Sequence, residues 1–386
     1  MNGCEEQGGS KAATSKDFGH QSKHRRVGYL FSQELMNAAD LLPANVGRSN
    51  LVHSLIHAYG LPGDMIPINP RPATLDQLLA FHDSGYLDCI ASPTPQHLEE
   101  YGLEHDCPLF PSLPTYCSLV AGASITAAQQ LVAGAVDIAL NWDGGRHHAH
   151  RDRASGFCYV NDIVLAILEL QKRYTQILYI DFDVHHCDGV ESAFLYTKRV
   201  MTLSFHRCES AFFPGTGTEF DAGRGKGGNH AINVPLRKGL CGPSLLQLFH
   251  PISKAILARL KPDCIVLQLG ADGVSGDPLD GGWNLDTHVL PSVVTEVVSW
   301  AKPTLILGGG GYHHANCART WTLATASAIG RTIEDEIPDH DHLTMYTPDF
   351  LISAPSGNMV DENKPRLSEI VERVLAVLPP ANSEAI

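Results

Sequence analysis

Short, wholly apolar runs alternate with longer amphipathic segments from Val27 onward. Apolar runs without polar alternation are typical of strands buried on both faces of a parallel sheet. They predict strands at 136–142, 177–183, 200–206, 231–235, 264–270 and 304–307. Length and periodicity predict helices at 116–133, 161–173, 243–260, 287–300, 315–329 and 367–378. The repeated strand-then-helix order predicts an α/β fold, a single domain whose central parallel sheet is sandwiched by helices.

No break in composition divides the chain after Val27, so we expect one domain over 27–386. Residues 1–26 contain little apolar material and are expected to form a disordered tail. Its basic end, 23–26, is either a solvated segment or a weak nuclear-import patch. The longer connections, at 92–114, 143–159, 207–229 and 271–286, nearly all follow predicted strands. Loops of that length commonly build a binding site, here at the carboxyl ends of the strands.

Composition excludes several functional classes. No apolar stretch reaches the roughly 18–20 residues of a bilayer span, and the amino terminus lacks a secretory apolar core, so an intracellular protein without a membrane anchor is expected. The net charge of -14 argues against direct nucleic-acid binding and suits a lysine-rich partner. The 10 cysteines include no Cys-x-x-Cys pair, which favours reduced core thiols over a thiolate zinc cluster.

Acidic and histidine residues follow the predicted strands and indicate a metal site. Asp181, Asp183 and His185 are spaced by two, so along an extended chain they would point to the same side. Asp272 follows the apolar run 264–270 after one alanine. Helix capping is a common role for one aspartate, but it does not explain acids after several strands. Asp183, His185 and Asp272 would give oxygen, nitrogen and oxygen ligands with a fourth position open, as in catalytic metal sites.

A second histidine pair is available for proton transfer. His147 and His148 lie on a glycine-rich loop, and neutral imidazole can take a proton from water whose pKa a metal has lowered to about 7. Imidazoles in such sites need orienting acids. We therefore expect His147 to pair with Asp181, and His148 with Asp188.

Two glycine-rich runs are candidates for phosphate-binding sites. The run 308–311 lacks the Gly-Lys-Ser/Thr ending of a phosphate loop, and Tyr312 after it is better interpreted as a hydroxyl donor to an oxyanion. The run 223–228 matches the dinucleotide fingerprint, but it precedes a strand instead of following one. Neither run predicts a nucleotide site.

The chain resembles the zinc-dependent histone deacetylase family, class I type, from about Val27 to the carboxyl terminus. Six ordered motifs carry the resemblance: Gly144-Gly145-Arg146-His147-His148-Ala149, Ala154-Ser155-Gly156-Phe157-Cys158-Tyr159-Val160-Asn161-Asp162, Asp181-Phe182-Asp183-Val184-His185-His186, Phe212-Phe213-Pro214-Gly215-Thr216-Gly217, Leu269-Gly270-Ala271-Asp272 and Gly308-Gly309-Gly310-Gly311-Tyr312.

The resemblance implies an arginase-deacetylase fold and a hydrolase that removes acetyl groups from lysine side chains of histones and other proteins. It also implies a role in chromatin and transcription regulation, in the nucleus and cytoplasm. By resemblance Asp183, His185 and Asp272 hold zinc, although these ligand types also permit Fe²⁺. By resemblance, His148 is the general base and acid, His147 its electrostatic partner and Tyr312 the carbonyl-polarising residue. The resemblance also implies that the substrate path is lined by Asp106, Gly156, Phe157, Phe213 and Leu279. It implies an inner cavity lined by Arg48 and Trp142.

The resemblance further implies two potassium sites. The first adjoins the zinc and matches Asp181, Asp183, His185, Ser204 and Phe205; the second matches Phe194, Thr197, Val200 and His230. An acid between two cations compensates its own burial.

Several positions depart from the family pattern. Cys187 stands where glycine is usual, which raises the question of a special backbone turn or of a thiol near the metal. Arg146 replaces an apolar residue and would need an acid or solvent if buried. His150 and Arg151 replace a common lysine pair, expected at the surface. The chain also lacks a long carboxyl-terminal extension and the basic pattern around Arg48, so dependence on a corepressor is not expected.

Three alternatives remain open. A deacetylase of small acetylated amines such as polyamines would share the zinc site. An arginase-like two-metal hydrolase would need more carboxylate ligands. A silent reader of acetylated tails would tolerate loss of Tyr312 or of the histidine pair.

Overall fold

A single parallel sheet organises the molecule. The computed structural model describes residues 25–279 and 282–380. Within them, eight strands pair in the order β2-β1-β3-β8-β7-β4-β5-β6, and every pairing is parallel. The strands are β1 Val27–Leu30, β2 Ile66–Ile68, β3 Ile138–Asn141, β4 Ile177–Asp181, β5 Val200–Arg207, β6 Ala231–Leu236, β7 Cys264–Gln268 and β8 Thr304–Leu307. The predicted α/β fold with one central parallel sheet is confirmed.

Helices connect the strands. They are α1 Gln33–Ala39, α2 Arg48–Ala58, α3 Leu75–Leu79, α4 Ser84–Ala91, α5 Leu113–Ala133, α6 Asp162–Leu170, α7 Asp188–Phe194, α8 Gly242–Leu260, α9 Val289–Ser299, α10 His314–Ile329 and α11 Leu367–Val377. The six predicted helices are all present, with ends within a few residues of the prediction. The periodicity did not reveal α1–α4, α7, β1 or β2, which are mostly short elements of 3 to 8 residues.

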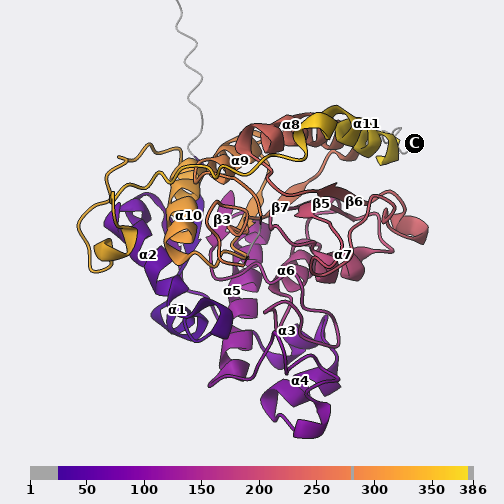
Figure 1. Cartoon of the computed structure of the whole chain (residues 1–386). Helices are drawn as coiled ribbons and strands as arrows, with labels where there is room; N and C mark the ends of the chain where they lie inside the picture. The colour runs from indigo at the N-terminus through magenta and orange to yellow at the C-terminus, as the bar shows by residue number, and fades with distance from the viewer. Residues whose placement is uncertain (1–24, 280–281, 381–386) are drawn as a thin grey trace, which may run out of the picture.

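Alternate residues of each strand enter different helical layers. Leu178 and Ile180 of β4 pack in the cluster that contains α2, α8, α9 and α10, whereas Ile177 and Tyr179 pack in the cluster that contains α5, α6 and α7. In the view of Figure 1, α8 and α9 lie above the strands and α5 and α6 below them. Both faces of the sheet are therefore covered, which explains why its strands are apolar without alternation.

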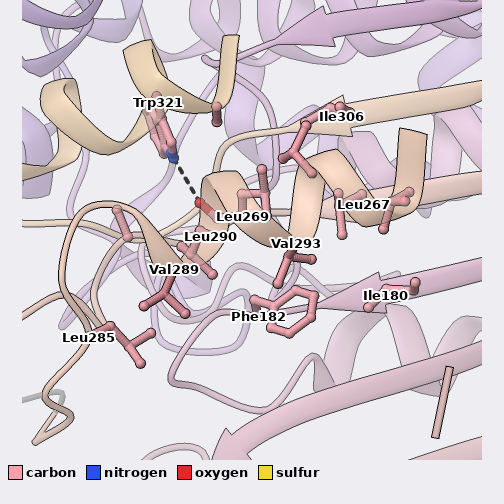
Figure 2. Close-up of a cluster of buried hydrophobic side chains, with 14 of the residues drawn as sticks. Ile180, Phe182, Leu267, Leu269, Leu285, Val289, Leu290, Val293, Ile306 and Trp321 are labelled. Atoms are coloured by element: carbon pink, nitrogen blue, oxygen red, sulfur yellow. Dashed lines mark hydrogen bonds between the residues drawn. The ribbon is translucent and has the colours of Figure 1, made fainter. Parts of the chain in front are cut away.

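The packing of α9 on the sheet shows how the site is supported. Val289, Leu290 and Val293 of this helix lie against Ile180, Phe182 and Leu267 from the strand ends (Figure 2). Burying one such side chain contributes roughly 1.5–3 kcal/mol. Beside them, the indole N–H of Trp321 donates to the carbonyl of Leu269 at 2.8 Å, which fixes the loop after β7.

The described residues begin at Arg25, two residues before the predicted start of the domain at Val27. Residues 1–24 of the expected tail lie outside the described residues. Arg25 donates to the carbonyls of Val298 (2.7 Å) and Lys302, and Arg26 forms an ion pair with Asp137 at 2.9 Å. These two arginines of the basic segment therefore contact the domain.

Among the described residues, no helix is both long enough and apolar enough to cross a membrane.

Candidate active site

The carboxyl ends of four neighbouring strands bring the predicted residues together. β3, β8, β7 and β4 are adjacent in the sheet. They continue into loops that carry 143–148, 308–312, Asp272 and 183–185, respectively. Because the strands are parallel, these loops emerge at one edge of the sheet, where open α/β sheets bind ligands.

Asp183, His185 and Asp272 converge at this edge. His185 Nδ1 lies 3.1 Å from Asp183 Oδ1 and 3.0 Å from Asp272 Oδ2, and one ligand atom from each residue lies within 4.8 Å of the others. The expected cause was wrong, since β4 ends at Asp181 and the chain does not stay extended. Instead, the peptide N–H of Asp183 donates to Asp181 Oδ1 (2.9 Å) and that of His185 to Asp183 Oδ1 (3.1 Å), so local turns aim the side chains.

The three side chains favour a positive charge between them. Burial and the neighbouring Asp183 carboxylate raise the pKa of Asp272. Burial acts against a charged His185, but the two carboxylates outweigh it and raise the pKa of this imidazole to about 10. Zinc ligands at about 2.0–2.2 Å in a tetrahedron lie roughly 3.4 Å apart, close to the separations of 3.0 and 3.1 Å seen here. The triad therefore fits a divalent cation.

His147 pairs with Asp181 deep in the site. Its Nδ1 lies 2.8 Å from Asp181 Oδ2, and its Nε2 lies 3.7 Å from Asp183 Oδ1. Burial opposes protonation, but the Asp181 and Asp183 carboxylates raise the pKa of His147 to about 9. The two carboxylates therefore favour the protonated form of this ring.

His148 pairs with Asp188 beside it. Its Nδ1 lies 2.7 Å from Asp188 Oδ1, and its ring lies against the rings of His147 and Phe213, with centroids 4.0 and 4.9 Å away. Burial and the neighbouring His147 lower the pKa of His148 to about 4. This ring is neutral at pH 7 and can accept a proton.

The glycine run after β8 places Tyr312 across the site. Gly310 donates its N–H to Asp183 Oδ2 at 2.8 Å, and a Cβ added to it would lie 2.5 Å from Asp272 Oδ2. Asp277 Oδ2 accepts from the peptide N–H of Tyr312 at 2.7 Å. The glycines thus allow the backbone to approach the triad, and Asp277 anchors the tyrosine.

The residues expected along the substrate path border different cavities, with Asp106 and Phe157 in one of about 200 Å³ and Phe213 in one of about 590 Å³. The rings of Phe157 and Tyr312 meet at 5.6 Å, and Phe213 is 41% exposed next to His148. Asp106 Oδ2 accepts from the Gly156 N–H at 2.5 Å. Leu279 lies further out, in a cavity of about 270 Å³ that also contains Phe212.

Arg48 and Trp142 lie on the inner side of the glycine run. Arg48 donates to the carbonyls of Gly309 (3.0 Å) and Gly311 (2.9 Å), and its guanidinium lies 4.9 Å from the Trp321 ring centroid. Trp142 stacks on Trp321 at 5.4 Å. The structure therefore groups the two residues expected in an inner cavity around Trp321, a second tryptophan that the sequence analysis did not name.

The candidate potassium residues lie on neighbouring elements. Asp181 of β4 is opposite Ser204 of β5, and Phe205 stacks on Phe182 at 5.1 Å. Phe194 ends α7, Thr197 follows it, Val200 opens β5, and His230 precedes β6 and accepts the Thr202 N–H at its carbonyl (2.9 Å).

Comparison with known families adds independent evidence. A model of the histone deacetylase domain matches residues 42–328. The chain belongs to the histone deacetylase family. Histone deacetylase 8 of Xenopus tropicalis is 42% identical over 355 residues, which cover 90% of this chain and 96% of that protein. Histone deacetylase 8 of Danio rerio is 41% identical, covering 93% and 95%. Histone deacetylase RPD3 of Saccharomyces cerevisiae is 40% identical, covering 92% and 84%.

These matches confirm the predicted membership of the class I type, as well as the local similarity to histone deacetylase 8 in the sequence motifs. The chain is a protein lysine deacetylase and a hydrolase of the metal-dependent kind.

Two departures from the histone deacetylase pattern are accommodated. Cys187 has φ -78°, so its turn does not require glycine, and its thiol is buried with Tyr179 and Val190. Arg146 is buried and donates to the carbonyl of Asp143 at 3.0 Å. Among the described residues, its Nε has no hydrogen-bond partner. The acids expected beside a buried arginine are Asp143 and Asp162, whose carboxylates interact with its charge electrostatically.

The third departure was misjudged. His150 was expected at the surface, but its side chain is 18% exposed and its Nε2 lies 3.2 Å from Asp188 Oδ2. Arg151 is 70% exposed, as expected, and pairs with Asp83 at 2.6 Å.

Several residues that the sequence analysis did not name form hydrogen bonds with the residues of the deacetylase site. Gln268 Nε2 donates to Asp183 Oδ2 at 3.0 Å, and the Tyr179 hydroxyl donates to Asp181. Asp162 accepts from the peptide N–H groups of Gly145 (3.0 Å) and Arg146 (2.7 Å), which fixes the histidine loop. Polar residues inside apolar strands, such as Gln268, were an available signal, because a buried polar group needs a partner.

Proposed function

We propose that this chain hydrolyses Nε-acetyl-lysine in proteins with one zinc ion held by Asp183, His185 and Asp272. The observation that carries the proposal is the convergence of these ligand atoms within 4.8 Å of one another, next to the neutral imidazole of His148. Fe²⁺ is a second candidate, since nitrogen and oxygen ligands accept both metals.

A divalent cation held by Asp183, His185 and Asp272 would supply a Lewis acid for the acetyl carbonyl and would lower the pKa of the attacking water to about 7. His148 takes the water proton at Nε2, because its Nδ1 is engaged by Asp188. The same Nε2–H then protonates the leaving lysine amine. Acetate and free lysine result.

Two further side chains stabilise charge in this mechanism. His147, kept protonated by Asp181, provides a fixed positive charge close to the reacting carbonyl. Tyr312 donates its hydroxyl to the developing oxyanion; burial raises its pKa well above the ordinary value, so it remains a proton donor.

The entrance residues suit a lysine side chain. Phe157 and Phe213 would flank its methylene stem, with Gly156 and Leu279 beside them, and the second oxygen of Asp106 would accept from the substrate backbone. Arg48 and Trp142 would line the cavity through which acetate leaves. A net charge of -14 favours basic acetylated segments such as histone tails as partners over nucleic acid.

We also propose two structural potassium ions. The first is held by Asp181, Asp183, His185, Ser204 and Phe205; the second is held near Phe194, Thr197, Val200 and His230. A monovalent cation beside Asp181 would offset the burial of this carboxylate. We further propose that the enzyme acts on chromatin in the nucleus and also in the cytoplasm, and that it does not need a corepressor.

The decisive experiment uses the purified chain on an acetyl-lysine peptide, with metal analysis before and after chelation. We expect one divalent ion per chain, loss of turnover on chelation and recovery with zinc. A parallel assay on acetylated polyamines separates the two substrate classes, and faster polyamine hydrolysis would overturn the protein-substrate proposal. Two divalent ions per chain would instead support an arginase-like site.

A further inference from the structure

Among the described residues, the His185 ring has hydrogen-bond partners at Nδ1 but none at Nε2. Its Nδ1 lies 3.1 Å from Asp183 Oδ1 and 3.0 Å from Asp272 Oδ2. A histidine that binds a metal usually donates its second ring N–H to a fixed acceptor, such as a carboxylate or a backbone carbonyl, which sets the plane of the ring. Within the described part of the chain, the plane of His185 is therefore left to ring contacts.

Phe212 makes a flat contact with this imidazole. The two ring centroids lie 5.2 Å apart and the ring planes differ by 5°, which is an offset stack. The rings of His148 and Phe213 meet His185 edge-on, with centroids 5.9 and 6.1 Å away and interplanar angles of 74° and 67°. Among the described aromatic rings, Phe212 alone lies parallel to His185, so its face fixes the plane of the imidazole.

Arg207 in turn holds the Phe212 ring. The central carbon of its guanidinium lies 4.3 Å from the Phe212 ring centroid, within the range of a cation–π contact. Arg207 is buried, and its Nε donates to the Glu209 carboxylate, while the Phe212 N–H donates to the Glu209 carbonyl at 3.0 Å. The Arg207 N–H donates to the carbonyl of Val184, the residue before His185, at 2.8 Å. These contacts place a guanidinium, a phenyl ring and an imidazole in series.

We infer that Phe212 and Arg207 are positioning residues for the divalent cation: Phe212 holds the plane of the ligand His185, and Arg207 holds Phe212. This inference rests on the proposed function, in which His185 is a metal ligand. The faces of a phenyl ring are electron-rich and attract electron-poor groups. An imidazole that shares a lone pair with a cation is electron-poor. Contact with Phe212 therefore favours the metal-loaded state and raises the affinity for the metal.

A purely electrostatic role for Arg207 would have the opposite sign. Arginine stays positively charged in proteins, so its charge repels a cation at the triad. If this repulsion dominated, replacing Arg207 by a neutral residue would tighten metal binding. In the positioning role, the same replacement loosens Phe212 and weakens metal binding. The sign of the change thus separates the two roles.

The test measures the zinc Kd of the full chain by competition with a fluorescent chelator. We expect zinc binding to weaken about tenfold in Phe212→Leu, the lower end of the usual loss when a metal-binding histidine loses its orienting partner. Arg207→Gln should bind zinc roughly threefold more weakly, the size of a cation–π contact. The double variant should bind no more weakly than Phe212→Leu, because Arg207 acts through that ring.

Conservative variants and a spectrum distinguish positioning from a general effect on stability. Phe212→Tyr keeps the ring and Arg207→Lys keeps the charge, so both should recover most of the zinc affinity. Phe220→Leu is the matched control, because Phe220 is 87% exposed, and it should bind zinc like wild type. In protein loaded with Co²⁺, the visible absorption bands should shift in Phe212→Leu but not in Phe220→Leu, since a rotated imidazole changes the ligand geometry.

Tighter or unchanged zinc binding in Arg207→Gln would overturn the role of Arg207, and unchanged binding in Phe212→Leu would overturn the inference as a whole. A lower Tm of both the metal-free and the zinc-loaded variants, at an unchanged zinc Kd, would likewise overturn it by showing that the stack is only structural. The expected losses of zinc affinity, in a wild-type protein that does not hydrolyse acetyl-lysine, would uphold the inference and contradict the proposed function. Hydrolysis together with unchanged zinc binding in every variant would do the reverse.

Discussion

Adjacent imidazoles at positions 147 and 148 differ in proton affinity because their neighbours differ. Two carboxylates raise the pKa of His147 to about 9, and burial together with that charged neighbour lowers the pKa of His148 to about 4. Groups whose surroundings push their pKa values apart are suited to different tasks in one site. At the residue scale, therefore, the division of labour between the histidines follows from their contacts.

Replacing Tyr312 by Phe tests the hydroxyl alone. We expect turnover on an acetyl-lysine peptide to fall about 10²–10³-fold, the usual effect of removing one oxyanion donor, while the ring still packs on Phe157. Steady-state kinetics and metal analysis give the result. Tyr196→Phe is the control because that ring is 64% exposed. Unchanged turnover with a full metal content would remove Tyr312 from the mechanism.

Gly156→Ala should impair the base without touching a ligand. An added Cβ would lie 2.3 Å from His148 Cδ2, at a residue whose φ of +54° already disfavours a side chain. We expect at least a tenfold loss of kcat/KM, with metal retained. Gly63→Ala is the matched control, because a Cβ there meets nothing within 4 Å. Wild-type kinetics in Gly156→Ala would contradict this expectation, because the His148 ring would then be able to move away from the added methyl group without loss of activity.

At the element scale, helix starts position the chemistry. α7 begins at Asp188, directly after Cys187, so the acid that contacts His148 and His150 sits in the first turn of a helix. α6 begins at Asp162 with Asn161 as its cap, and the same aspartate binds the histidine loop. The first N–H groups of a helix have no partner within the helix, and at α6 the Asn161 side chain supplies one by accepting the Val164 N–H at 3.0 Å, which fixes the backbone there.

Cys187→Ala tests whether the thiol before α7 has a chemical role. The side chain is fully buried, and burial raises the pKa of its thiol well above the ordinary value, so it stays uncharged. We expect a loss of about 1–2 kcal/mol in the free energy of unfolding from the lost packing, with kcat within twofold of wild type. Urea unfolding and peptide kinetics measure the two effects. A large drop in kcat at unchanged stability would mean that the site depends on this sulfur.

At the scale of the whole molecule, buried charge links the site to folding. Asp183 and Asp272 are both buried, next to the carboxyl ends of the strands β4 and β7. Burying carboxylates is costly unless cations or hydrogen-bond donors compensate them. The stability of the fold should therefore depend on the metal and on pH.

Chelation should lower the free energy of unfolding by about 3 kcal/mol relative to protein kept at a free zinc concentration 100-fold above its Kd. Thermal unfolding with and without chelator measures it, and added zinc should restore the wild-type curve. In Asp272→Ala the two curves should nearly coincide, because the ligand set is broken. An equal response of both proteins would place the stabilising metal elsewhere.

His82 should make stability depend on pH. Its Nε2 accepts the Asn161 N–H at 3.0 Å, which requires a neutral ring, and burial lowers its pKa to about 4. Because the folded pKa lies below the unfolded value of about 6.5, the stabilisation is present above pH 6.5 and is lost as pH falls towards 4. Between pH 7 and 5 the loss from this group is roughly 2 kcal/mol.

The measurement for His82 is urea unfolding at both pH values in wild type and His82→Gln. The variant should lose less stability than wild type over this range by about the same 2 kcal/mol. Parallel losses in the two proteins would show that other groups cause the pH dependence.

The strands and the ligand acids were accessible from the sequence for a local reason. Burial on both faces of a sheet makes a run of residues almost wholly apolar, so 264–270 and 304–307 were recognisable from their composition, and an aspartate soon after such a run is conspicuous. β2, with three residues and a proline at position 67, carried no such pattern. Short helices such as α3, with five residues, are equally hard to recognise.

The sequence by itself determined the α/β class, most strands and the residues that converge at their carboxyl ends, because side-chain burial imprints a local period on the chain. Only the tertiary structure decided which groups share a partner. Gly310 reaches Asp183 across 127 positions, and His150 reaches Asp188 across 38. No local period encodes such contacts, since they depend on how parallel strands and their loops are brought together in space. That is why His150, expected at the surface, lies beside the carboxylate that contacts His148.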